Sequence, residues 1–252
     1  MLIFALKVLQ MINSVRNTVL SVLNKNNYGY ISPSDFNLFA KQAQLDIFED
    51  YFYQYNYQIN KENARQSGTG YADITKGYSE VIDSFSVTED LTYIATNTFS
   101  VPTELTTGSD YYLINKVLFN NGTSLKEMEQ VSHSKITMLL NSLYTAPSAT
   151  FPAFTIEDST LTAYPDTINS ATEVKCQYIR YPKDPKWTYL SLTGGEPAFD
   201  STANDYQDFE LPLDNEPDLI MKILQYAGMS IREIAAVQFA QATENKDDAD
   251  QK

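Results

Sequence analysis

The feature that most constrains the fold is the stretch from Ser32 to Ile59, whose pattern predicts a long helix. Ser32 suits the N-cap, Pro33 the first helical position and Asp35 the positive end of the helix dipole. Apolar and aromatic side chains then recur at helical spacing over roughly half of the circumference. Such a helix must be covered on two sides, by other helices, a sheet or a neighbouring subunit. The apolar positions are Phe36, Ala40, Ala43, Ile47, Tyr51 and Tyr55, with Phe39, Phe48, Phe52 and Ile59 beside them.

A preceding helix can supply one side of this cover. Residues 1–23 carry apolar side chains at three- and four-residue steps, which predicts an amphipathic helix. Met11 is an equally good start for a shorter version of it. Together with the next helix it would form a helical hairpin over residues 1–65.

A C-terminal helix is predicted for residues 211–243, because acidic residues and Pro217 stand at its start and apolar residues follow at helical spacing. Gly228 is followed by residues that match a capping box, which predicts that the helix kinks and restarts there. We expect this helix and residues 1–65 to form one helical layer. Residues 244–252 are charged and predict a flexible acidic tail.

Between the helices, residues 66–210 predict a mixed, β-rich domain. Apolar and polar residues alternate from Tyr78 to Val101, as in half-buried strands. Tyr111–Phe119 is also strand-like and runs into Asn120–Gly122, a sequence that reverses the chain. We therefore predict a hairpin, with Glu127–Val131 as the returning strand.

The rest of this domain predicts one short helix and more strands. The helix covers residues 132–143, with Ser132 as its N-cap and Pro147 just beyond its end. Residues 188–210 contain Gly194-Gly195 in polar surroundings and predict a loop or arm. The strands are richer in Tyr and Thr than in Leu, which favours a thin, mostly antiparallel sheet and an α+β fold. They are Phe151–Glu157 and Thr160–Tyr164, on either side of the tight-turn pair Asp158-Ser159, and Glu173–Tyr181.

Composition argues against several classes of function and site. The formal net charge of −14 argues against binding nucleic acid through its phosphates, and 18 Tyr with 13 Phe favour protein interfaces. Cys176 is the only cysteine and His133 the only histidine, so neither an internal disulfide nor a His-rich metal site is expected. The N-terminal pattern predicts neither a secretory signal nor a transmembrane span.

A spelling like that of an EF-hand calcium loop begins at Asn24, with Asn26 at position three and Asp35 at position twelve. A calcium site needs several carboxylates, whereas positions one and three are neutral here and position five is Tyr28. The simpler interpretation is a turn followed by a capped helix, so no metal is expected.

No motif for catalysis stands out. His133 lies between Ser132 and Ser134, but adjacent side chains at the start of a helix point apart, which favours local hydrogen bonding over a nucleophile system. The acidic clusters at 46–50 and 205–210 match solvated faces as well as they match glycosidase carboxylates. We expect no enzyme and no cofactor.

Several segments resemble ring or head-to-tail connector proteins in the virions of crAss-like, short-tailed bacteriophages. The resemblance covers most of the chain in order, through Asn24–Pro33, Asp35–Gln44, Val131–Ser134, Thr145–Ser148, Tyr164-Pro165 and Tyr178–Trp187.

The resemblance implies a structural role in the virion, after assembly in the host cytoplasm. Connectors of this kind stack beneath the portal as rings, commonly of twelve copies, and hold and conduct the genome during packaging and ejection. Expected partners are further copies, the portal, other tail or neck proteins, and DNA passing through without sequence-specific binding; no membrane is expected. The Tyr-rich faces would make the subunit contacts. The interface candidates are Tyr51, Tyr53, Tyr55, Tyr57, Tyr111, Tyr178 and Trp187.

Two other functions stay open. A tail-associated module that binds or cleaves glycans would use the aromatic residues and carboxylates, and it predicts a monomer or trimer with a cleft. A calcium-responsive binding protein predicts a melting temperature that rises with calcium and falls when Asp35 is changed to Ala.

Overall fold

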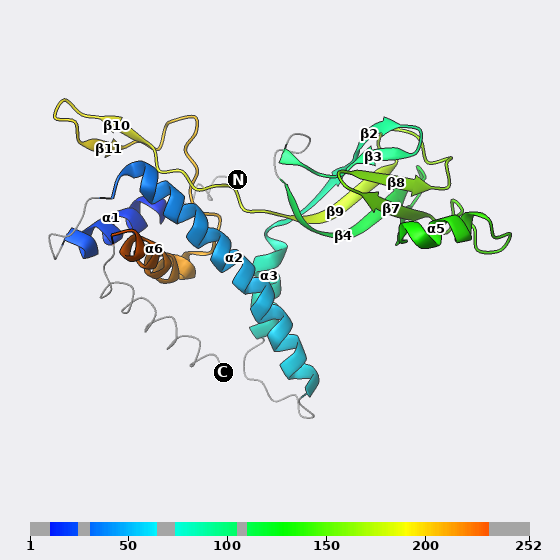
Figure 1. The fold of residues 1–252 in the computed structure, drawn as a ribbon, viewed down its shortest axis with the longest axis horizontal. Helices are drawn as coiled ribbons and strands as arrows, with labels where there is room; N and C mark the ends of the chain where they lie inside the picture. Colours follow the sequence, from blue (N-terminus) through cyan, green and yellow to red (C-terminus); the bar gives the residue numbers. More distant parts are fainter. Residues whose placement is uncertain (1–10, 25–30, 65–73, 105–109, 232–252) are drawn as a thin grey trace, which may run out of the picture. The chain divides into compact units, whose positions relative to one another are not determined.

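The computed structural model describes residues 11–24, 31–64, 74–104 and 110–231 (Figure 1). Helices and small, mostly antiparallel sheets make up this part of the chain, which confirms the α+β class. The chain divides into two compact units. Residues 1–81 and 182–252 belong to the first, which we call the helical unit, and residues 82–181 form the second, the β unit.

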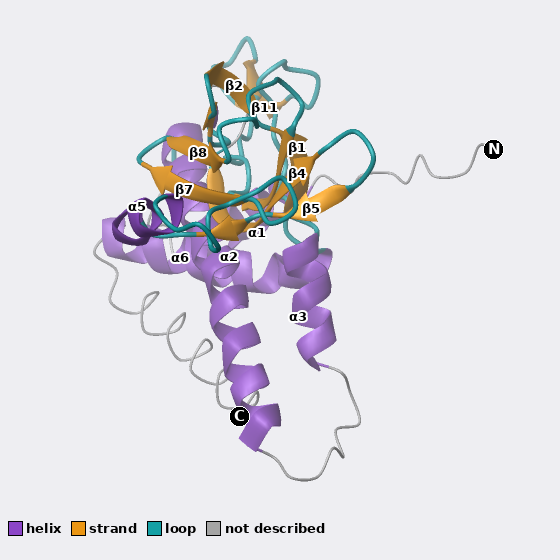
Figure 2. Ribbon diagram, turned by 90° about the vertical axis from the view of Figure 1, so that its right-hand side faces the viewer, coloured by secondary structure: helices purple, strands orange, loops and turns teal. Residues whose placement is uncertain are grey.

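In the helical unit, α6 packs against both α1 and α2, and Figure 2 shows these helices together in purple. The face of α6 that makes these contacts buries Leu219 and Ile223 completely. The elements of the unit are α1 (Met11–Asn24), α2 (Pro33–Ala64), most of α3 (Ile74–Asp83), β10 (Tyr189–Ser191), β11 (Pro197–Phe199), the short 3-10 helix η1 (Leu213–Asn215) and α6 (Glu216–Ile231).

The long second helix is confirmed as α2, with the expected start. Its cap is reciprocal: the Asp35 N–H donates to Ser32 Oγ at 3.2 Å, and Ser32 Oγ donates to Asp35 Oδ2 at 2.6 Å. The apolar stripe is buried only over the first half of the helix, where Phe36 and Phe48 are almost inaccessible. Beyond Ile47 and Phe48 most of the aromatic side chains are half-buried or exposed.

Two expectations for the helices were wrong. Residues 78–83 were predicted as strand but belong to α3, because Tyr78, Val81 and Ile82 also fit helical spacing. The C-terminal helix does not break at Gly228 but continues to Ile231. A glycine inside a helix costs about 1 kcal/mol, and the burial of neighbouring apolar residues such as Ala227 outweighs it.

Some predictions fall outside the described residues: the helix over residues 1–10, the turn at 25–30, the loop at 65–73, and the chain beyond residue 231 with its acidic tail. The finer arrangement, in which a helical hairpin over residues 1–65 and a C-terminal helix form one layer packed with the β domain, stays a prediction.

The β unit contains two sheets. The four-stranded sheet has the order β1-β9-β4-β5 and is antiparallel throughout, whereas the five-stranded sheet has the order β2-β3-β8-β7-β6, with β6 parallel to β7. The elements are β1 (Ser86–Asp90), β2 (Thr92–Ala95), β3 (Thr98–Ser100), β4 (Tyr111–Asn120), β5 (Leu125–Glu127), β6 (Glu129–Gln130), α5 (His133–Leu140), β7 (Ala153–Glu157), β8 (Thr160–Tyr164) and β9 (Val174–Arg180).

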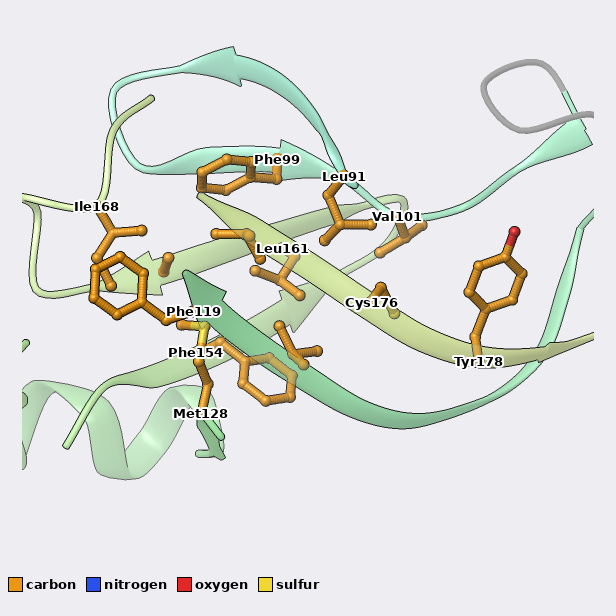
Figure 3. Packing of buried hydrophobic residues seen from close by; sticks show 13 residues of the cluster. Leu91, Phe99, Val101, Phe119, Met128, Phe154, Leu161, Ile168, Cys176 and Tyr178 are labelled. Carbon is orange, nitrogen blue, oxygen red and sulfur yellow. The ribbon is translucent and has the colours of Figure 1, made fainter. Parts of the chain in front are cut away.

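One apolar core joins the two sheets, and Figure 3 shows how its side chains converge. Phe99 and Leu161 come from the five-stranded sheet, and Val117 and Cys176 from the four-stranded one; all four are fully buried. The single thin sheet that the Tyr- and Thr-rich strands predicted is therefore two sheets that cover each other's apolar faces.

The predicted hairpins are confirmed, with one change of partner. The β4–β5 turn has Gly122 at φ 82°, and the Asn121 side chain accepts hydrogen bonds from the following backbone. β4 pairs with Leu125–Glu127, whereas Glu129–Gln130 leaves that sheet and pairs with β7. The β7–β8 hairpin turns at Asp158, which has a positive φ of 52°.

The expected boundary at residue 210 differs from the observed one. Residues 182–210 were grouped with the strands, but they belong to the helical unit. Part of this segment forms the β10–β11 hairpin, which turns at Gly195 with φ 82°. The grouping follows from side-chain contacts made by Trp187 and its neighbours, which no alternation of apolar and polar residues encodes.

Candidate interaction surfaces

Trp187 anchors the 182–210 segment to two helices. Its indole N–H donates to Asn13 Oδ1 of α1 at 3.1 Å. Its backbone N–H donates to Asn37 Oδ1 of α2 at 2.8 Å, and its carbonyl accepts from Asn37 Nδ2 at 3.2 Å. The Arg16 guanidinium lies 3.7 Å from the centre of the indole ring, a cation–π contact. Through its backbone and its side chain, this one residue joins three segments that are far apart in the sequence.

The same indole also holds the β10–β11 hairpin. Tyr189 and Phe199 each stack on Trp187, with ring centroids 5.7 and 5.8 Å away. Tyr206 in turn packs edge-on against Phe199. Burial and then the negative charge of Asp208 raise the pKa of Tyr206 to about 12.

Carboxylates and an amide fasten the remainder of this segment. Asp208 accepts hydrogen bonds from the backbone N–H groups of Met11 and Ile12, as an N-terminal capping residue does. Gln44 of α2, almost fully buried, donates to the Lys183 carbonyl at 2.8 Å and accepts from the Glu210 N–H at 3.0 Å.

The acidic clusters that sequence analysis weighed as glycosidase carboxylates have structural contacts. Asp46 accepts a hydrogen bond from the Tyr226 hydroxyl, which ties α6 to α2. Asp205 pairs with Lys186 at 2.6 Å, and the hydrogen bond from Lys186 lowers the pKa of that carboxyl. Glu210 accepts the Lys183 N–H at 2.8 Å. Asp46 and Glu210 thus connect segments of the helical unit, whereas Asp205 forms an exposed ion pair.

The two residues most suggestive of other chemistry also have local contacts. Asp35 is part of the α2 cap, while Asn24 ends α1 and Asn26 lies outside the described residues. The His133 ring N–H donates to the carbonyl of Ile156 at 3.2 Å. Within the described residues, no group of three or more His, Cys, Asp or Glu side chains is placed to hold a metal ion.

Burial corrects two of the predicted interface residues. Trp187 is buried among the contacts described above, and Tyr178 is fully buried in the β unit, with its hydroxyl 3.3 Å from Glu89 Oε2. Neither side chain is at the surface, so neither is available to a neighbouring copy. The aromatic content that predicted an interface here serves the interior of each unit.

The other tyrosines in that prediction are more accessible. Tyr53 is 66% exposed, and Tyr55, Tyr57 and Tyr111 are half-buried. Tyr51 is partly occupied inside the unit, because its hydroxyl donates to Asn215 Oδ1 at 2.6 Å and its ring packs edge-on against Tyr78. Burial raises the pKa of Tyr51, although the hydrogen bond to Asn215 acts in the opposite direction. The role of these tyrosines in an interface stays a prediction.

A larger exposed apolar surface lies on α5 and the loop that follows it. Ile136 and Leu139 face inward against β7 and β8, and both ribbon views place α5 beside β7. The opposite side of the helix and the loop expose their apolar side chains, most of all Leu143 at 88% and Tyr144 at 93%. We call this surface the α5 patch; it consists of Met138, Leu140, Leu143, Tyr144 and Phe151.

Sequence reasoning missed this patch, although a signal was present. Residues 136–156 contain no charged side chain, in a chain where 20% of residues are charged. The sequence pattern predicts for this helix one apolar face, made of Ile136, Leu139, Leu140 and Leu143 and without Met138. Position 138, however, lies on the side of the helix opposite to 136, and Leu140, one turn after Ile136, is still 46% exposed.

A second exposed apolar surface lies on the β10–β11 hairpin of the helical unit. Leu190 and Leu192 are 61% and 56% exposed, and Tyr189 exposes about half of its surface while it stacks on Trp187. We call Leu190 and Leu192 the hairpin patch; Tyr189 lies on the opposite face of the strand, toward Trp187. A two-stranded hairpin is marginal in isolation, so contacts on this face would add to its stability.

None of the described helices is long and apolar enough to cross a membrane. Comparison with known proteins finds no family model that matches the chain and no curated protein that matches it.

Proposed function

We propose that the chain is a structural subunit of a phage virion. It assembles with copies of itself into a ring in the portal-proximal neck or tail, joins head to tail, and conducts the genome. The sequence segments that resemble connector proteins of crAss-like phages support the place in the virion. The observation that carries the assembly is the exposure of large apolar side chains on both units, on the α5 patch and on the hairpin patch.

In this proposal, the helices of residues 1–65 and 211–243 form the body of the ring. The half-exposed second half of α2, with Tyr53 at its most accessible point, is covered by a neighbouring subunit. This contact would explain why the apolar stripe of α2 continues beyond the half of the helix that is buried within the subunit.

The net charge of −14 suits a channel that DNA passes through. Acidic groups that line such a channel repel the phosphates at short range and keep the duplex from binding to the wall. The expected genome contact is therefore one of weak repulsion without sequence preference.

The mass of the full chain in solution tests the proposal. Sedimentation and native mass spectrometry, over a concentration series with and without portal protein, are expected to show a ring-sized species. Negative-stain images should show rings with a central opening. A chain that stays single under all these conditions and cleaves surface polysaccharide would instead support the glycan-processing alternative.

A further inference from the structure

We propose that Asn121 is a site of spontaneous deamidation, and that the β4–β5 turn confines the reaction to molecules in which this turn has opened. The inference is independent of the proposed assembly. Of the nine glycines in the chain, only Gly122 follows an asparagine. An asparagine before glycine reacts most readily, because glycine has no side chain that hinders attack by its own nitrogen. Both residues are exposed at the tip of the hairpin.

The reaction needs only water. The backbone nitrogen of Gly122 loses its proton and forms a bond to Cγ of Asn121. The bond from Cγ to Nδ2 breaks, and Nδ2 takes up a proton and leaves as ammonia. Water then opens the five-membered imide at one of its two carbonyl groups, which yields aspartate or isoaspartate. Either product adds one negative charge, and isoaspartate also routes the main chain through the former side-chain carbon.

Hydrogen bonds in the turn oppose both requirements of this reaction. The Gly122 N–H donates to Asn120 Oδ1 at 3.1 Å, so the attacking nitrogen gives up its proton less readily. Asn121 Oδ1 accepts from the N–H groups of Thr123 at 3.0 Å and Ser124 at 2.8 Å, which fix the position of the amide. The amide is therefore held in the turn and is not free to rotate onto the nitrogen.

The rate of deamidation in the folded chain then depends on how often the turn opens. It equals the rate in the unfolded chain multiplied by the fraction of time for which these hydrogen bonds are broken. Three hydrogen bonds of ordinary net strength predict that deamidation is at least about tenfold slower in the folded chain than in the unfolded chain.

The product would disturb the hairpin that the turn connects. The turn sets the register of β4 with β5, in which Leu118 lies opposite Glu127. Directly after β5, the Met128 N–H donates to the Val117 carbonyl at 2.9 Å, and both side chains are buried in the core of the β unit. Isoaspartate lengthens the main chain inside the turn, so this register should no longer fit.

Incubation of the full chain in mildly alkaline buffer, with and without urea, tests the proposal. Peptide mapping by mass spectrometry follows the loss of ammonia at Asn121. The folded wild-type chain should react at least about tenfold more slowly than the chain in urea. Asn120→Ala removes the acceptor of the Gly122 N–H and should react severalfold faster than wild type when folded. Asn120→Asp is the matched control, because its carboxylate can accept the same hydrogen bond, and it should react at the wild-type rate.

In urea all three chains should react alike, and hydrogen exchange in β4 and β9 shows whether each variant is folded in its absence. Equal rates for wild type with and without urea would overturn the protection by the turn, and this comparison needs no variant. An Asn121 that stays intact in urea would overturn the site itself. A folded Asn120→Ala chain that reacts no faster than wild type would overturn the role of the Gly122 hydrogen bond.

Discussion

The β unit and the helical unit each have an apolar core, but they differ in how their segments are joined. The β unit closes its core between two sheets that residues 82–181 supply, with fully buried side chains such as Phe99 and Leu161 at the centre (Figure 3). The helical unit joins helices from both ends of the chain, and a third segment holds them through Trp187, Gln44 and Asp208. Both units bury many apolar side chains, and the helical unit also depends on a few side chains that connect segments distant in the sequence.

This difference bears on assembly. Contacts such as those of Trp187 place the β10–β11 hairpin, and with it the hairpin patch, on the helical unit. The α5 patch is placed by the apolar packing of α5 on the strands beside it. A change at Trp187 should therefore affect the hairpin patch selectively, and the comparison between units can be tested residue by residue.

Trp187→Ala is the change with the largest expected effect. The substitution removes the indole, and with it the stacking of Tyr189 and Phe199, the cation–π contact with Arg16 and the hydrogen bond to Asn13. It should lower the free energy of unfolding by about 4 kcal/mol. Hydrogen exchange measured by mass spectrometry should accelerate in α1, α2 and the hairpin. Trp187→Phe keeps a ring for stacking and should cost less. Equal acceleration in the strands of the β unit would contradict the comparison.

Phe99→Ala tests the other unit. The side chain is fully buried between the sheets, and its loss should cost about 3 kcal/mol through burial and cavity terms. Exchange should accelerate in β3 and β8. Fluorescence reports the helical unit, because Trp187 is the only tryptophan, and it should stay unchanged in native buffer. Phe99→Leu, which keeps most of the volume, should cost about 1 kcal/mol. A shifted emission maximum in the Ala variant would show that the core of the β unit also controls the Trp187 environment.

Local features of the fold could be predicted from the sequence. The cap at Ser32 and Asp35, the turn at Gly122 and the turn at Asp158 each depend on the chemistry of a few adjacent residues. For that reason the start of α2 and the hairpins were predicted correctly. The α+β class follows from patterns of the same local kind: helical spacing of apolar residues in some segments, and alternation of apolar and polar residues in others.

Features that depend on distant contacts could not be predicted in this way. The pattern around Val81 fits both a strand and a helix, and tertiary packing selects the helix α3. The side chains of Tyr178 and Trp187 resemble interface aromatics in composition, but only their contacts show that they are interior. The α5 patch was missed for the opposite reason, since Met138 and Leu140 have the composition of a core and lie at the surface.

Asp208→Ala should have a smaller effect, confined to the start of α1. The carboxylate satisfies two first-turn N–H groups, so its loss should cost about 1 to 2 kcal/mol. The amides of Met11 and Ile12 should exchange faster, whereas the β unit should not change. Asp205→Ala, in the same segment, removes an exposed pair with Lys186 and should leave stability nearly unchanged. Equal losses in both variants would mean that the capping contact has no special weight.

Alkaline pH should cause the smallest loss of stability. It should affect the two units at different pH values, because each contains a different group whose pKa is raised by burial. Burial raises the pKa of Cys176 in the β unit from 9.0 to about 12. Between these values the unfolded chain has lost the thiol proton and the folded chain retains it, so stability must fall as pH rises above about 9. At pH 10 the loss should be about 1 kcal/mol. Urea titrations between pH 8 and pH 10.5 measure this slope.

Cys176→Ala is the matched control for this slope. The variant starts from lower stability, because it leaves a cavity in the core, but it should show a flatter dependence on pH over the same range. The pKa of Tyr206 in the helical unit, raised from 10.0 to about 12, acts only at higher pH. The β unit should therefore respond to alkali first. An unchanged slope in the Cys176 variant would show that the buried thiol does not couple proton loss to unfolding, and alkaline sensitivity would then no longer separate the two units.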